Sequence, residues 1–163
     1  MRKAVFLALL ISLSWVPPAF AFDLEGQVRL DPPFPEPAWL EIPENHREDC
    51  GERKLSPRLQ ISPEGFVANA VVKLEGVFPE PEKFPLREFT LNQIGCEFSP
   101  HVLLVPQGGE VTILNSEAML HNVRAFNEQT EMLFNDAMPK KGQVLKKRFD
   151  EPGRVILRCG IHH

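Results

Sequence analysis

A thiol and two imidazoles are the side chains of this sequence best suited to bind a metal ion. The chain closes on RCGIHH, in which Cys159 and His162 are three residues apart. That spacing lets a tight loop turn both side chains toward one ion. A third donor, His121, begins the segment HNVRAF further upstream. Thiolate and imidazole are ligands that proteins use for copper and zinc, so the three residues form a candidate metal site.

Copper is the metal that this donor set favours. Two imidazoles and one thiolate make the trigonal set of copper electron-transfer sites, usually completed by a weak axial methionine. The soft thiolate suits Cu(I), and imidazole accepts both oxidation states. A rigid β-sandwich fold would hold nearly the same ligand geometry in both oxidation states, so the ligands would move little when an electron is transferred. We therefore expect one mononuclear copper ion bound by His121, Cys159 and His162.

Other interpretations of these residues remain open. CGIHH is one residue from the haem-attachment motif C-x-x-C-H, but His162 stands where the second cysteine belongs. Zinc accepts the same donors as copper. No Asp or Glu is placed as a general base beside the motifs, so we do not expect an enzyme. The alternative functions are copper storage or delivery, or a β-sandwich that binds a partner without redox chemistry.

Most of the chain is predicted to form short β-strands. Turn sequences such as PQGGE, PKKG and DEPG bound most of the apolar or alternating runs. One short helical turn is expected over residues 127–138, and several short strands at regular spacing predict an all-β sandwich. The predicted strands cover residues 24–30, 66–76, 87–94, 101–107, 109–116, 121–127, 143–149 and 153–159.

The segment from Cys96 to His163 resembles the cupredoxins. It contains CEFSPHVLLVPQGGEVTILNSEAMLHNVRAF followed by RFDEPGRVILRCGIHH. More specifically, it resembles the plastocyanin-like exported proteins associated with methylamine utilisation. In that family a strand ending in Asn-Ser or Asn-Asp precedes a ligand histidine followed by Asn. A Phe-x-x-x-Gly segment then introduces the strand that ends in the ligand cysteine.

The resemblance implies a cupredoxin-like Greek-key β-sandwich and assigns roles to matching residues. His121 matches the first ligand histidine, Cys159 the ligand cysteine and His162 the second ligand histidine. Asn115 matches the asparagine that ties the two ligand loops together, and Asn122 stands at a polar position beside the first histidine. The implied function is one-electron transfer between redox partner proteins by an exported copper protein, which we expect to be a monomer.

The remaining histidines are expected to lie outside the ligand set. Adjacent residues on an extended loop point opposite ways, so one of His162 and His163 should bind and the other should not. The spacing from Cys159 and the family pattern select His162. His101 is interpreted as a structural histidine at a strand entrance, although a role as an extra ligand is conceivable. His46, in a charged stretch, is expected to be exposed.

The sequence departs from the cupredoxin pattern at its end. It stops at His163, before the family's axial methionine and the strand that would close the sandwich. We expect a fragment, because a sheet without its closing strand exposes an unpaired edge. Met119, Met132 and Met138 all precede Cys159, so no axial ligand is assigned. Met119 and Met132 are interpreted as packing or surface residues.

Residues 1–21 have the layout of a secretory signal peptide. Two basic residues precede an apolar run over residues 4–15, which is too short to span a bilayer, and the segment ends in the small-x-small pattern of Ala19 and Ala21. Cleavage after Ala21 is expected to leave a soluble chain that does not insert into a membrane. We expect the mature protein in the periplasm or otherwise secreted.

An exported chain with three cysteines is expected to pair two of them. Sequence alone permits three pairings. Cys50 and Cys96 lie in loop-like contexts, EDCGER and IGCEFSP, whereas Cys159 follows the apolar run RVILR. The preferred arrangement is a Cys50–Cys96 disulfide with Cys159 as the remaining thiol.

The mature chain, residues 22–163, has the length of one domain with a single core. Within it, residues 31–63 are dense in proline and charge. We interpret them as an ordered excursion, because disordered linkers rarely carry Trp and Cys. The formal net charge is −4 and the basic residues are scattered, apart from a run over 139–149 that we interpret as a solvated loop and strand edge. We therefore expect no nucleic-acid partner.

Overall fold

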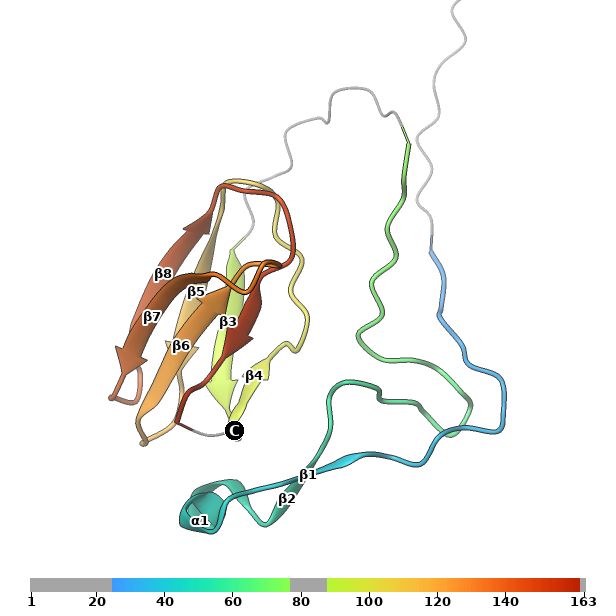
Figure 1. The fold of residues 1–163 in the computed structure, drawn as a ribbon, viewed down its shortest axis with the longest axis horizontal. Coiled ribbons are helices and arrows are strands. Elements are labelled where there is room, and N and C mark those ends of the chain that lie inside the picture. The colour runs from blue at the N-terminus through green and yellow to red at the C-terminus, as the bar shows by residue number, and fades with distance from the viewer. Residues whose placement is uncertain (1–24, 77–87, 162–163) are drawn as a thin grey trace, which may run out of the picture.

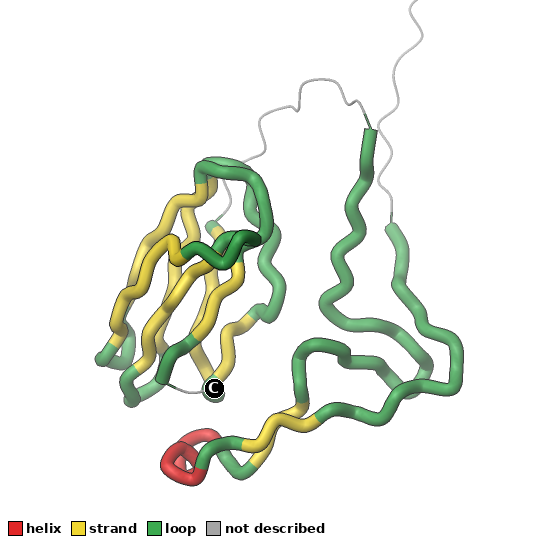
Figure 2. Tube along the Cα trace, in the orientation of Figure 1, coloured by secondary structure: helices red, strands yellow, loops and turns green. Residues whose placement is uncertain are grey.

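The computed structural model describes residues 25–76 and 88–161, and these residues form an all-β architecture of short strands (Figures 1 and 2). Helix in this part of the chain is limited to a 3-10 turn, η1 (Glu44–His46), and one α-helical turn, α1 (Arg47–Cys50). None of its helices is long and apolar enough to cross a bilayer. The predicted signal peptide, residues 1–21, lies outside the described residues, as do residues 162–163.

Two sheets stack face to face to form a sandwich (Figure 1). Its strands are β3 (Phe89–Ile94), β4 (Glu97–Ser99), β5 (Gly109–Asn115), β6 (His121–Phe126), β7 (Met132–Met138), β8 (Val144–Phe149) and β9 (Ile156–Arg158). One sheet has the order β4-β3-β5-β8 and the other β7-β6-β9. β3 and β5 are parallel, and the other neighbouring pairs are antiparallel.

The core lies between the two sheets and follows from alternation along the strands. Every second residue of β5 is buried from Gly109 to Asn115, and every second residue of β6 is buried beginning with His121. Alternate residues of a strand point to the same face, so these positions face the opposite sheet. The fully apolar part of this core consists of Leu91, Val111, Ile113, Val123 and Met138. Asn115 and His121 are polar members of the same buried faces.

The N-terminal segment, residues 25–76, is joined to the sandwich by covalent and ionic links. Within it, β1 (Trp39–Glu41) and β2 (Arg53–Leu55) form an antiparallel hairpin that encloses η1 and α1. The predicted Cys50–Cys96 disulfide is confirmed, and Cys159 is not part of it. Lys54 also pairs with Glu97, with Nζ and Oε1 3.1 Å apart.

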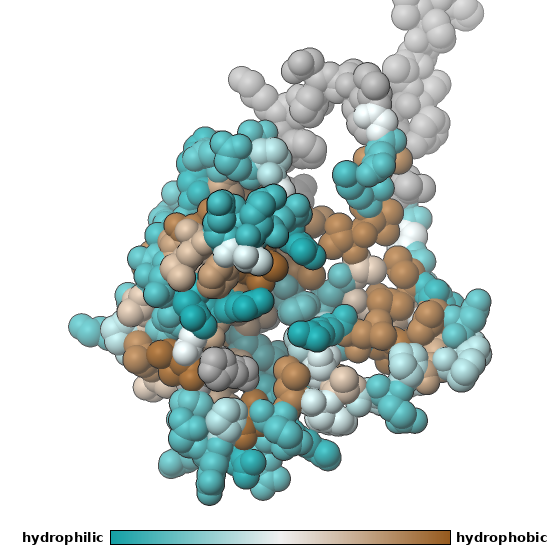
Figure 3. Space-filling view, in the orientation of Figure 1, coloured by the Kyte–Doolittle hydropathy of each residue, from teal (hydrophilic) through white to brown (hydrophobic). Residues whose placement is uncertain are grey.

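The N-terminal segment carries large apolar side chains on its surface (Figure 3). Among its described residues, Ile42 and Cys50 are the buried members of the apolar core, whereas Val72 and Leu74 are 76% and 72% exposed. Hydrophobic burial, the main driving force of folding, is therefore small in this part of the chain. The hairpin and the disulfide constrain this segment more than burial does.

Three predicted strands are absent from the described part of the chain. Residues 25–30 and 66–76 form irregular structure with isolated bridges at Arg29, Phe66 and Val67. Residues 101–107 form a loop. The apolar run in that loop has no two-residue period, and periodicity is what distinguishes a strand from a buried loop. Its side chains Leu103 and Val105 pack against the core cluster without strand pairing.

The helical turn expected over residues 127–138 is also wrong, because this segment contains β7. Met132 to Met138 pair along the length of β6, with His121 opposite Met138. A strand beside a buried neighbour gains cross-strand packing, which outweighs a weak local preference for helix. The three-residue strands β1, β2 and β4 were not predicted, since their patterns are too short to show a period.

We expect Ile113→Ala to destabilise the sandwich strongly. Ile113 is 0% exposed at the centre of the core, and truncating a buried isoleucine to alanine costs about 2–5 kcal/mol in free energy of unfolding. The matched control is Leu104→Ala, because Leu104 is 69% exposed and should change stability by less than about 0.5 kcal/mol. Urea denaturation measures both. Similar losses in the two variants would contradict the assignment of the core.

Candidate metal centre

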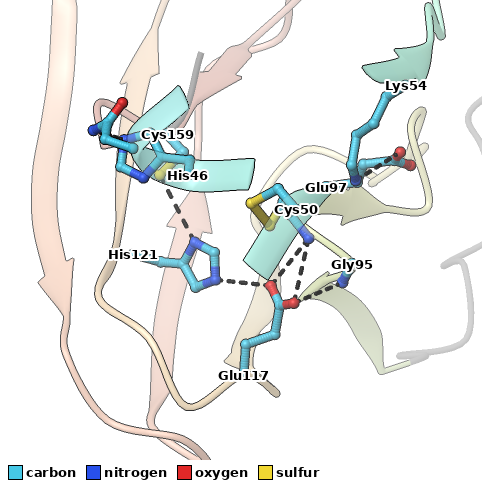
Figure 4. Close-up of a disulfide and its surroundings, with 10 residues drawn as sticks. His46, Cys50, Lys54, Gly95, Glu97, Glu117, His121 and Cys159 are labelled. Carbon is cyan, nitrogen blue, oxygen red and sulfur yellow. Dashed lines mark hydrogen bonds and ion pairs between the residues drawn. A yellow bond between two sulfur atoms is a disulfide. The ribbon is translucent and has the colours of Figure 1, made fainter. Parts of the chain in front are cut away.

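His121 and Cys159 meet at one end of the sandwich because β6 and β9 are antiparallel neighbours. His121 is the first residue of β6, and Cys159 directly follows the last residue of β9. The pairing places Arg124 opposite Arg158, so the end of β9 returns to the beginning of β6. Cys159 Sγ lies 3.8 Å from His121 Nδ1 (Figure 4). Two of the three predicted ligands are therefore in contact distance.

The separation of these two donor atoms fits two ligands of one metal ion. Bonds of about 2.3 Å to sulfur and about 2.0 Å to nitrogen place two donors roughly 3.5–3.9 Å apart at ordinary bond angles. His121 is buried, with 2% of its surface exposed, and Cys159 is half-buried. The two residues line a small pocket together with Gln93, Cys96, Glu97 and Phe98. A thiol and an imidazole nitrogen that face each other suit copper or zinc.

The third predicted ligand, His162, lies outside the described residues, as does its neighbour His163. Within residues 25–76 and 88–161, no three His, Cys, Asp or Glu side chains are grouped so that they could hold a metal ion. The described part of the chain thus supplies two donors of the expected set. His162 remains a prediction.

The other nitrogen of the His121 ring lies against a carboxylate. Glu117 Oε2 is 2.9 Å from His121 Nε2 (Figure 4). The same carboxylate accepts hydrogen bonds from the backbone N–H groups of Gly95, at 3.0 Å, and Cys96, at 3.1 Å. Sequence reasoning missed Glu117. The sequence does place Glu117 four residues before the predicted ligand His121. In a loop, however, that spacing does not by itself indicate that two side chains are in contact.

Asn115 organises the loop that leads to His121. Its side chain is buried, and Nδ2 donates to the carbonyl oxygens of Met119, at 3.0 Å, and Met138, at 2.8 Å. Its Oδ1 accepts a hydrogen bond from the Glu117 N–H, at 2.8 Å. The family pattern led us to expect that Asn115 ties the two ligand loops together. Among the described residues, its side-chain bonds instead join the loop over residues 116–120 to β7.

Asn122 makes the connection between the two ligand loops. The Gly160 N–H donates to Asn122 Oδ1, and Asn122 Nδ2 donates to Asn135 Oδ1 on β7, at 2.7 Å. Gly160 also permits close packing, because an added Cβ would lie 2.7 Å from the Arg124 guanidinium carbon. Asn122, the residue beside the predicted ligand His121, therefore holds the backbone next to Cys159.

Among the remaining sequence candidates, one histidine is exposed, one is half-buried and one methionine packs in the core. His101 is exposed, and His46, which was expected to be exposed, is half-buried beside Asn45. Met138 is 0% exposed and belongs to the core cluster. The Gln93 side-chain amide donates to Met138 Sδ at 3.1 Å.

Comparison with models of known protein families, with curated proteins and with solved structures finds no match for this chain. The chemistry of the site must therefore be inferred from its own atoms. Those atoms are the thiol of Cys159 and Nδ1 of His121, both held at the end of a sandwich by hydrogen bonds with polar side chains.

We expect Asn115→Ala to destabilise the protein by about 2–4 kcal/mol, because it leaves two carbonyl oxygens and one N–H without partners next to the core. The control is Asn127→Ala. Asn127 also makes side-chain hydrogen bonds, with Glu131, but these are solvent-exposed and should contribute less than about 1 kcal/mol. Chemical denaturation of both variants measures the difference, and an equal loss would contradict the role assigned to Asn115.

Proposed function

We propose that this chain is an electron-transfer protein of cupredoxin type, with one copper ion bound by His121, Cys159 and His162. The observation that carries the proposal is the pair of donor atoms, Cys159 Sγ and His121 Nδ1, 3.8 Å apart. A thiolate stabilises Cu(I), and imidazole accepts either oxidation state. Copper, when bound, supplies a one-electron couple. The protein supplies the ligands and keeps their positions fixed.

The arrangement of strands supports a Greek-key sandwich of the cupredoxin kind. The chain crosses from one sheet to the other between β5 and β6, between β7 and β8, and again between β8 and β9. Repeated crossing between two sheets is characteristic of Greek-key sandwiches. The parallel pair β3 and β5 is joined through β4 and the loop after it, all within one sheet. The start of β6 and the end of β9, which carry the proposed ligands His121 and Cys159, lie at one end of the sandwich.

The surroundings of the donors suit rapid electron transfer because they restrict movement. Asn115 holds the loop before His121, and Asn122 holds the backbone beside Cys159. Networks of satisfied buried hydrogen bonds make the local structure rigid. Burial of His121 excludes water from one side of the site, whereas half-buried Cys159 gives a protein partner access from the other. We expect that partner to be a redox protein.

The disulfide supports the proposal that this protein acts outside the cytoplasm. Disulfides persist in oxidising compartments such as the periplasm and the extracellular space. The Cys50–Cys96 bond therefore fits with the predicted signal peptide over residues 1–21. We propose that the mature chain is periplasmic or secreted, functions as a monomer, and binds neither nucleic acid nor membrane.

Visible absorption of the copper-loaded, oxidised full chain tests the proposed function. A Cys159 thiolate bonded to Cu(II) should give an intense charge-transfer band in the visible range, and Cys159→Ser should abolish it. The matched control is His101→Gln, which replaces an exposed histidine outside the donor pair and should leave the band unchanged. A copper-loaded protein that stays colourless when oxidised would exclude electron transfer and favour copper storage or delivery.

A further inference from the structure

We infer that Glu117 is a positioning residue for the metal site, which fixes the His121 ring so that its unprotonated Nδ1 faces Cys159. The inference begins with the two nitrogens of one imidazole. Nε2 lies 2.9 Å from Glu117 Oε2, and Nδ1 lies 3.8 Å from Cys159 Sγ. Figure 4 shows the ring between the carboxylate and the thiol. The ring thus has an acidic partner on one side and a prospective fellow ligand on the other.

The carboxylate decides which nitrogen carries the proton. An ionised carboxylate accepts hydrogen bonds and donates none, so Nε2 must be the N–H that faces Glu117. In a neutral imidazole the other nitrogen then has a lone pair and no hydrogen. That nitrogen is Nδ1, which faces the Cys159 sulfur. Metal-ligating histidines commonly donate their second ring N–H to a carboxylate, which fixes the tautomer and raises the basicity of the ligand.

Glu117 is itself held in place by the turn between β3 and β4. Gly95 and Cys96 are the two central residues of this turn, with φ of +62° and +56°. Their successive N–H groups both point at the carboxylate, at 3.0 and 3.1 Å. Consecutive N–H groups in a turn form a concave site that favours an anion. The Cys50–Cys96 disulfide crosslinks the same turn to α1.

The charge of Glu117 has a second consequence. Its side chain is 17% exposed, and the His121 side chain is 3% exposed, so water screens the pair weakly. A negative charge next to a ligand stabilises the more positive oxidation state of the bound ion. Neutralising Glu117 should therefore raise the reduction potential of a bound copper ion. This consequence rests on the proposed function, whereas the orientation and tautomer of the ring do not.

The tautomer of His121 in the metal-free, full-length protein tests the inference directly. Long-range proton–nitrogen NMR of the ring, in ¹⁵N-labelled protein with neutral imidazole, distinguishes Nε2–H from Nδ1–H. We expect the wild-type ring to be in the Nε2–H form and Glu117→Ala to give a mixture. The opposite tautomer in the wild type would overturn the inference, and this measurement needs no folded variant.

Copper binding provides the second readout. Glu117→Gln removes the charge but keeps the size of the side chain, and we expect Cu(I) affinity, measured by competition with a chromogenic chelator, to fall about 10- to 100-fold. The matched control is Glu97→Gln, because Glu97 lines the same pocket but pairs with Lys54. Its affinity should stay near that of the wild type. Equal losses in both variants would overturn the positioning role of Glu117.

The two readouts separate failure of this inference from failure of the proposed function. If the wild-type protein binds no copper but shows the Nε2–H tautomer that Glu117→Ala disturbs, the positioning role stands and the proposed function falls. If copper binds and the Glu117→Gln variant has an unchanged tautomer, affinity and reduction potential, the proposed function stands. Glu117 is then only a cap for the turn at Gly95 and Cys96, and the inference is wrong.

Discussion

The candidate copper site depends on the antiparallel pairing of β6 with β9. Cys159 and His121 are far apart in the sequence, and the backbone hydrogen bonds between these two strands bring them to the same end of the sandwich. The register matters as much as the pairing. A shift by one residue would turn alternate side chains to the opposite face. His121 would then leave the buried face that it shares with Val123, and the contact with the Cys159 sulfur would be lost.

A second constraint follows from placing polar side chains on a face that is otherwise apolar. Buried polar groups must form hydrogen bonds, because an unsatisfied group costs free energy. Buried Asn115 meets this requirement by donating to the Met138 carbonyl oxygen, and buried His121 by its contact with Glu117. Half-buried Asn122, on the other face of β6, accepts a hydrogen bond from the Gly160 N–H beside Cys159. The bonds that make burial tolerable also fix the positions of the donor atoms. The stability of the sandwich and the geometry of the candidate site therefore depend on the same network, and its loss would affect both.

The N-terminal segment is coupled to this network through one turn. Cys96 forms the disulfide with Cys50 of the N-terminal segment, and its backbone N–H donates a hydrogen bond to Glu117. It also adopts a left-handed backbone conformation, which a residue with a side chain rarely does. The turn is thus restrained both by the disulfide to Cys50 and by the hydrogen bonds to the Glu117 carboxylate. The segment itself buries little apolar surface, so the crosslink is the firmest connection between the two parts of the chain that the structure describes.

The sequence by itself determined the strands whose alternation puts one face in the core, such as those containing Ile113 and Val123, because burial on one side imposes a period of two. It also indicated the Cys50–Cys96 disulfide and the donor types at His121 and Cys159. The tertiary structure decided that residues 101–107 form a loop and 132–138 a strand, since continuous apolar runs and short segments depend on their neighbours. It alone revealed the roles of Glu117 and Asn122. Their hydrogen bonds depend on loop conformation and strand register, and neither residue spacing nor composition encodes these.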